Sequence, residues 1–376
     1  MADTQRPDED GESSFTQLGR APGDKQLLSR LTVIGGAVGG LFGIACLFVL
    51  DRASAFFIPV ILAHLLDRLL SPIVRSGRRI GIPSPLGAAI VVVVFLGILG
   101  GGIYSLSGPA TEWIESAPQK MKVAEYKLRG VTKPLETVQQ AAEEVDKAAS
   151  RTQEGEAQAI RVQEGQSLGG VLLDQTRASI SGLLITIFLL YFLLASGDLL
   201  LRKIVRLLPA FHYRKKAVRI LRCIERDLSH YLGMVVLINV GLGLAVGGAM
   251  ALIGMPNPML WGALAGLLNF VPYLGPAINI TVVGLVALVS FEGTGQALLA
   301  PLAYLVLNGI EASLITPVAM GWRLQLNPVV IFIALTFWAW IWGIPGALLA
   351  VPLLATAKIT CDRVALLRPI GDLLER

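Results

Sequence analysis

The sequence predicts an all-α polytopic membrane protein with six full transmembrane helices, two helical hairpins broken by proline and glycine, and a small extramembranous helical insertion. The 376 residues are 54% apolar and only 16% charged. Soluble domains hold about 45–50% apolar residues with glycine included, and about 25% charged residues. The apolar residues also gather in continuous runs of about 20, the length of helix that crosses a bilayer. We therefore expect about eight membrane segments.

Six apolar runs carry this prediction, and the polar stretches between them define the expected organisation. The runs are Leu31–Leu50, Ala53–Val74, Pro85–Ser107, Ala178–Gly197, Tyr231–Ile253 and Gln296–Met320. The expected parts are a polar tail (1–30), N-terminal membrane helices (31–107), a helical insertion (108–177), a fourth span (178–197), a basic amphipathic segment (198–230), a C-terminal membrane core (231–360) and a second tail (361–376).

The loops are charged asymmetrically. Basic residues gather in the two tails, in the loop after the second run and in segment 198–230, which alone holds nine. The positive-inside rule places these parts, and therefore both termini, in the cytoplasm. The insertion 108–177 then lies outside, as a helical cap or a substrate-catching domain. Segment 198–230 is expected to lie along the inner leaflet and to attract anionic lipid.

Several function classes are excluded or disfavoured. The net charge of +5 does not indicate nucleic-acid binding, because no aromatic residues interleave the basic cluster as a stacking platform would require. The cysteines Cys46, Cys223 and Cys361 are far apart and odd in number, so no disulfide framework, metal site or cofactor is expected. Neither a Gly-x-Ser-x-Gly nor a His-Glu-x-x-His motif occurs, so we expect no enzyme.

Two apolar stretches, 258–290 and 328–360, are too long for one upright helix and short for two. Each opens with Asn-Pro and is interrupted near its middle. The interrupting residues are Pro272, Gly275, Pro276, Gly343, Pro345 and Gly346. Proline ends a helix and glycine permits a tight reversal, so each stretch is predicted to be a hairpin of two half-length helices. The alternative is a pair of ordinary kinked spans.

Such hairpins would indicate a binding site within the membrane. A turn inside the membrane is tolerated only where protein buries it or a watery cavity meets it. Two interrupted segments in corresponding positions are the best sequence indication of a transporter's binding site. The predicted topology lets the two hairpins enter from opposite sides of the membrane, as an inverted repeat would.

Glu311 is the strongest candidate site residue, because it lies midway along the run between the two stretches. Placing a carboxylate inside the membrane costs free energy and therefore needs an explanation. Asn308 shares its helical face and Thr316 follows just over one turn later. The carboxylate could bind a cation, accept hydrogen bonds from a hydroxylated ligand, or carry a proton. The structural alternative is a buried ion pair or a protonated glutamate bonded to a neighbouring helix.

The remaining candidates are weaker. Asn269 and Tyr273 flank the first interruption, where they could contact a ligand or satisfy loose carbonyls. His64 and Asp67 lie near the inner end of the second run, as capping and snorkelling residues or as a proton relay. Arg323 follows the run that contains Glu311 and is expected on the cytoplasmic side.

At these motifs the chain resembles the AI-2E transporter family of bacterial inner membranes, over roughly Ala45–Thr360. The matching motifs are Leu268–Pro276, Glu311 with Ile315-Thr316-Pro317 and Gly321, Asn327-Pro328, and Trp342–Pro352. The sequence departs from the family pattern at Met234, where a glutamine is frequent, and at Gly197-Asp198, where the order is usually reversed. The resemblance implies about eight membrane segments, a homo-oligomer with a pentamer favoured, and elevator-like movement of the part with the hairpins.

Together these observations predict a secondary transporter that exports a small polar, autoinducer-2-like solute by alternating access of a site lined by the hairpins. No phosphate-binding Gly-x-x-x-x-Gly-Lys-Ser/Thr motif is present, so ATP is not expected to drive it directly. The alternatives are a monovalent cation/proton antiporter that uses the same carboxylate, and a membrane scaffold that transports nothing.

Overall fold

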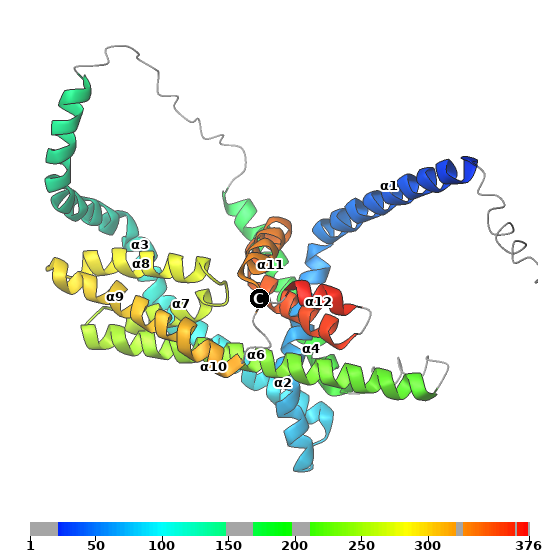
Figure 1. Cartoon of the computed structure of the whole chain (residues 1–376). Helices are drawn as coiled ribbons and strands as arrows, with labels where there is room; N and C mark the ends of the chain where they lie inside the picture. Colours follow the sequence, from blue (N-terminus) through cyan, green and yellow to red (C-terminus); the bar gives the residue numbers. More distant parts are fainter. Residues whose placement is uncertain (1–21, 148–167, 198–210, 321–325, 365–366, 375–376) are drawn as a thin grey trace, which may run out of the picture. The chain divides into compact units, whose positions relative to one another are not determined.

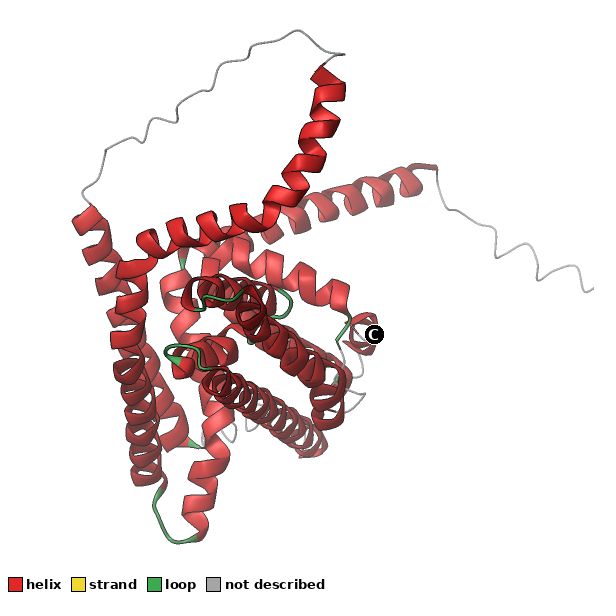
Figure 2. Cartoon of the chain, turned by 90° about the vertical axis from the view of Figure 1, so that its left-hand side faces the viewer, coloured by secondary structure: helices red, strands yellow, loops and turns green. Residues whose placement is uncertain are grey.

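The computed structural model describes residues 22–147, 168–197, 211–320, 326–364 and 367–374, and these residues are helical apart from short loops (Figure 2). Figure 1 follows the helices along the chain. They are α1 (Pro22–Arg52), α2 (Ser54–Arg79), α3 (Ser84–Lys147), α4 (Leu168–Ser196), α6 (Phe211–Ile253), α7 (Pro258–Leu268), α8 (Leu274–Ser290), α9 (Thr294–Ile310), the π-helix η1 (Glu311–Ile315), α10 (Thr316–Met320), α11 (Pro328–Arg363) and α12 (Arg368–Leu374).

Six of the described segments are long and apolar enough to cross a membrane, which confirms the predicted class of helical membrane protein. They are Ile34–Arg52, Ser54–Arg79, Ser84–Gln119, Ala217–Ile253, Thr294–Met320 and Pro328–Arg363. The predicted fourth span, 178–197, corresponds to the last part of α4, which ends at Ser196 and whose shorter apolar part is Ile180–Ser196. The chain divides into two compact units, Met1–Ser54 with α1 and Ala55–Arg376 with all other described helices.

Two helices run on past the predicted boundaries. α3 continues through Gly108 and Pro109 to Lys147, so the insertion 108–177 begins inside a helix and its residues 148–167 lie outside the described residues. α6 runs without a break from Phe211 to Ile253, so the described part of segment 198–230 extends the fifth span directly. Its apolar stripe is buried or half-buried within the protein, with Leu228 only 1% exposed.

Small residues bring α6 and α7 into close antiparallel contact. Gly243 and Gly247 on α6 face Gly262 and Gly266 on α7, each pair being four residues apart. A Cβ added at Gly243 would lie 2.9 Å from the carbonyl oxygen of Gly262, and one at Gly266 would lie 2.8 Å from that of Asn239. Small residues at this spacing allow membrane helices to approach backbone to backbone. The contact therefore sets the register that brings Asn239 beside the end of α7.

Aromatic residues fix the other side of α7. The indole Nε1 of Trp261 donates a hydrogen bond of 2.8 Å to the carbonyl oxygen of Pro256, which ties the first turn of α7 to the preceding loop. Trp113 of α3 meets Trp261 edge to face with ring centroids 5.2 Å apart. Offset and edge-on aromatic pairs at this distance are favourable. α8 packs against α7 and α9 (Figure 1), and together they complete the buried core of this region, in which Val283, Ala287 and Ala300 are fully buried.

The first interrupted stretch is a helix–turn–helix. Tyr273 has φ 65° and ψ −53°, and the Leu274 amide donates to the Pro272 carbonyl over 2.7 Å, so the turn closes as a γ-turn with positive φ. The amides of Phe270, Val271 and Gly275 also bond within the turn. A Cβ at Gly275 would overlap the Leu268 carbonyl oxygen, so only glycine allows this closure.

The second interrupted stretch is broken at Gly343 inside α11. Gly343 has φ 63° and ψ −140°, a conformation that is open to glycine alone. Three residues later Gly346 lies against the Trp338 carbonyl oxygen, where a Cβ would overlap it. Both interruptions therefore pair a residue of positive φ with a following glycine that touches the end of the preceding helix.

Candidate functional site

A cavity of about 580 Å³ lies among α6, the turn between α7 and α8, the α9–η1–α10 helix and α11. This volume is within the range of about 300–1,000 Å³ found for sites of small ligands. All five residues predicted to bind solute or ion line it, together with two of the turn prolines. They are Asn269, Tyr273, Asn308, Glu311, Thr316, Pro272 and Pro276.

Glu311 occupies the wall of the cavity at the first position of the π-helix η1, with a side chain that is 8% exposed. Its Oε1 accepts a hydrogen bond from the Thr316 hydroxyl, five residues later. A π-helix places residues i and i+5 one above the other, which is why this pair can meet. No described lysine or arginine lines the cavity, and Glu311 makes no ion pair with a described residue.

A chain of three asparagines extends from Glu311's helix across the cavity. The Asn308 amide donates to Oδ1 of Asn269 over 3.4 Å, and the Asn269 amide donates to Oδ1 of Asn239 over 2.8 Å. The chain ends on Nδ2 of Asn239, which is buried and finds no hydrogen-bond partner among the described residues. Unpartnered buried donors are costly in a packed protein, so this amide is a polar group that the local packing leaves unused.

Tyr304 and Asn279 form a buried polar pair outside the cavity. Tyr304, Asn308 and Glu311 follow each other at i, i+4 and i+7, so they share one face of the α9–η1 helix. The Tyr304 hydroxyl lies near Asn279 of α8, and the described residues provide neither side chain with a well-formed hydrogen bond. The polar face of this helix therefore continues beyond the cavity into the core.

Asn239, Asn279 and Tyr304 were not among the residues predicted from the sequence. The sequence does contain an indication of the role of Asn239. Asn239 lies four residues before Gly243 and eight before Gly247, on the face that the small residues mark as a helix contact. An amide on that face is expected to find a partner on the neighbouring helix.

The other predicted residues lie elsewhere. Gly275, Gly343, Pro345 and Gly346 are not among the cavity's lining residues; they belong to the two interruptions. His64 is exposed on α2, and Asp67 is buried beside Arg68 with a nitrogen–oxygen distance of 3.5 Å. Neither lines the cavity. Arg323 lies outside the described residues, although Met320 and Leu326 on either side of that gap line the cavity.

The arrangement can bind an uncharged, hydroxyl-rich solute. The carboxylate of Glu311 accepts hydrogen bonds, the asparagine amides donate and accept them, and the Tyr273 phenol can do either. Among the described residues there is no group of three histidine, cysteine or acidic side chains that could hold a metal ion.

Comparison with known proteins places these features in a family. The model for the AI-2E family transporters matches residues 38–365, which is most of the chain. The chain belongs to the AI-2E transporter family. This confirms the resemblance found in the sequence motifs, and it makes the protein an integral membrane transporter.

Individual relatives cover nearly the same length. This AI-2E transporter is 26% identical over 320 residues to the AI-2 transport protein TqsA of Escherichia coli (strain K12), covering 83% of this chain and 87% of TqsA. It is 27% identical over 313 residues to YrrI of Bacillus subtilis (strain 168), covering 81% of this chain and 86% of YrrI. The family model describes transporters and TqsA is named as an AI-2 transport protein, so neither the scaffold nor the antiporter alternative is favoured by these comparisons.

Proposed function

We propose that this AI-2E transporter is a secondary transporter that exports a small polar, autoinducer-2-like solute across the bacterial inner membrane. The observation that carries the proposal is the cavity around Glu311, in which a buried carboxylate faces open volume without a described basic partner. The printed name of TqsA supports the class of solute.

The chemistry of the lining fits a furanosyl compound with several hydroxyl groups. Hydroxyls donate to Glu311 and exchange hydrogen bonds with Asn269 and Asn308. The apolar remainder of the wall, which includes Phe270, Ile331 and Val351, suits the ring carbons. Small-ligand sites generally combine such an apolar lining with a few polar groups that fix orientation.

We further propose the topology and assembly in which this site operates. Both termini lie in the cytoplasm, the two interrupted stretches are hairpins that enter from opposite sides, and the membrane segments number about eight. The charge asymmetry of the loops supports this orientation. The protein forms a homo-oligomer, with a pentamer favoured, contacts anionic lipid on the cytoplasmic side, and moves its hairpin part to expose the cavity alternately.

Glu311→Gln tests the proposal, because it keeps the shape of the side chain and an oxygen for Thr316 while removing the charge. Uptake of labelled autoinducer-2 into inside-out membrane vesicles should fall at least about tenfold, the loss typical of a hydrogen bond to a charged group. Glu292→Gln is the matched control, since Glu292 is exposed and does not line the cavity; its uptake should be unchanged.

Two results would contradict the proposal. Full uptake by Glu311→Gln at normal expression would remove the carboxylate from the mechanism. Proton movement driven by a Na⁺ gradient in proteoliposomes without any organic solute, and lost in Glu311→Gln, would instead identify an antiporter.

A further inference from the structure

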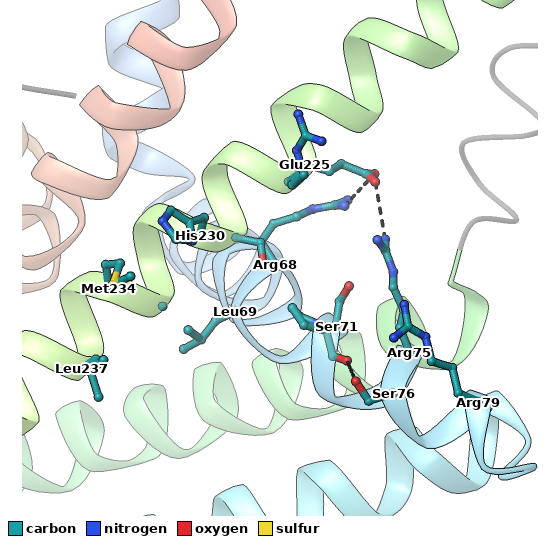
Figure 3. A pocket seen from close by; sticks show the side chains of 14 residues that line it. Arg68, Leu69, Ser71, Arg75, Ser76, Arg79, Glu225, His230, Met234 and Leu237 are labelled. Atoms are coloured by element: carbon teal, nitrogen blue, oxygen red, sulfur yellow. Dashed lines mark hydrogen bonds and ion pairs between the residues drawn. The ribbon is translucent and has the colours of Figure 1, made fainter. Parts of the chain in front are cut away.

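A second cavity, of about 600 Å³, lies between α2 and the middle of α6 and shares no lining residue with the cavity around Glu311. Figure 3 shows Arg68 and Arg75 of α2 converging on Glu225 of α6. An adjoining cavity of about 480 Å³ shares five of its lining residues, Arg68, Ser71, Arg75, Glu225 and Arg226. We call the two together the arginine pocket.

The arginine pocket is strongly basic. Its charged lining consists of Arg68, Arg75, Arg78, Arg79, Arg222 and Arg226 against Asp67 and Glu225. Six guanidinium groups against two carboxylates leave a net charge of +4 in one concave site. Guanidinium groups gathered in one site repel one another, and a bound anion would relieve that repulsion.

The two carboxylates do not neutralise this cluster. Oε1 of Glu225 lies 2.6 Å from Arg68 and Oε2 lies 3.5 Å from Arg75, so one carboxylate holds two guanidinium groups in place. Asp67 lies beside Arg68 at 3.5 Å. Within the described part of the chain, Arg78, Arg79 and Arg222 form no ion pair.

We propose that the arginine pocket binds a phosphate group, carried either by a phospholipid head group or by a free phosphorylated solute. The guanidinium fork matches phosphate oxygens with two parallel hydrogen bonds, and basic pockets between membrane helices bind lipid head groups. The hydroxyls of Ser71 and Ser229 add donors at the same site.

The shape of the pocket favours a lipid as the carrier. Leu69, Met234 and Leu237 line the end away from Arg75 and Arg79, as Figure 3 shows. A head group at the arginines would place its glycerol and first acyl carbons along this apolar end. A free solute would leave it unfilled.

The test measures ligand-dependent thermal unfolding of the full chain in detergent, since a ligand that binds only the folded state raises the midpoint in proportion to its affinity. The probes are dioctanoyl phosphatidylglycerol, dioctanoylglycerol without a phosphate, and glycerol phosphate without acyl chains. We expect phosphatidylglycerol to stabilise and dioctanoylglycerol not to. Stabilisation by glycerol phosphate would identify a free phosphate as sufficient, and its failure would identify the lipid.

The matched variants separate the pocket from general surface charge. Arg79→Gln with Arg222→Gln should weaken phosphatidylglycerol binding about tenfold or more. Lys215→Gln with Arg219→Gln removes the same charge from exposed positions of α6 outside the pocket. This control should change the affinity for phosphatidylglycerol less than about twofold.

Three results would overturn the proposal. They are equal stabilisation by dioctanoylglycerol, equal losses in the two double variants, and wild-type binding that does not weaken as salt rises. The salt dependence is measured on the wild-type protein, so it can still refute the proposal if a variant fails to fold.

Discussion

Tyr273 is where the backbone of the site is most strained. It is one of two non-glycine residues with positive φ in the described part of the chain, the other being Asn257. Conformations of this kind cost about 1–3 kcal/mol and persist where the surroundings impose them, often at functional sites. The side chain is 58% exposed, so burial does not offset the cost. The strained turn places Tyr273 among the residues that line the cavity.

Tyr273→Gly and Tyr273→Ala should separate this strain from the role of the phenol. Both variants lose the ring and should transport less. Only glycine relieves the positive φ, so Tyr273→Gly should be more stable than Tyr273→Ala by about 1 kcal/mol. Thermal unfolding in detergent measures the difference. Equal stability would mean that the turn carries no strain in the folded protein.

The sequence could locate part of the site because charged and polar groups are costly in an apolar run. That reasoning led to Glu311 and from it to Asn308 and Thr316. It could not lead to Tyr304 or Asn279, because a phenol or one amide costs far less than a charge and is common in packed helices. Their importance depends on which helix lies opposite, and the sequence alone does not show that.

At the scale of the elements, proline and glycine predicted where the helices break, but they did not predict the backbone conformation of each break. The positive φ falls on Tyr273 in the first break and on Gly343 in the second. The π-helix at Glu311 has no signal in its sequence, since it is a change of hydrogen-bond register within an apolar helix. The helix that begins at Ser84 does not end at Ser107 but continues through Gly108 and Pro109 to Lys147, so the insertion expected over 108–177 starts within α3.

Gly275→Ala and Gly346→Ala should each disrupt one break. A Cβ at either position overlaps a backbone carbonyl oxygen, which cannot move as a flexible side chain can. Overpacking of this kind costs about 1–3 kcal/mol, seen as a lower unfolding midpoint and reduced transport. Gly248→Ala is the control, because nothing lies within 4 Å of its added Cβ in helix α6. It should be neutral or stabilising by up to about 1 kcal/mol. Unchanged unfolding midpoints for Gly275→Ala and Gly346→Ala would show that the backbone at each break can move to accept a methyl group.

At the scale of the whole molecule, the central question is from which side each break is reached. The predicted topology lets the first break open to the outside and the second to the cytoplasm, but loop charge barely separates this arrangement from two single crossings, which would move only Arg323 to the other side. Helix lengths do not decide this, since both orders of insertion use the same helices. Labelling of single cysteines from each side of the membrane does decide it.

The reporter positions follow from the geometry of the breaks. Cysteine at Gly275 or Gly346 would overlap a carbonyl oxygen, whereas Tyr273 and Ile344 are exposed by 58% and 79% beside the same breaks. In a chain whose native cysteines are replaced by serine, Tyr273→Cys should react with an impermeant maleimide from outside and Ile344→Cys from inside. Ile80→Cys and Glu292→Cys, both exposed, calibrate the inner and outer sides. Labelling of both breaks from one side only would exclude the opposed hairpins, and the alternating-access proposal would then need another pair of gates.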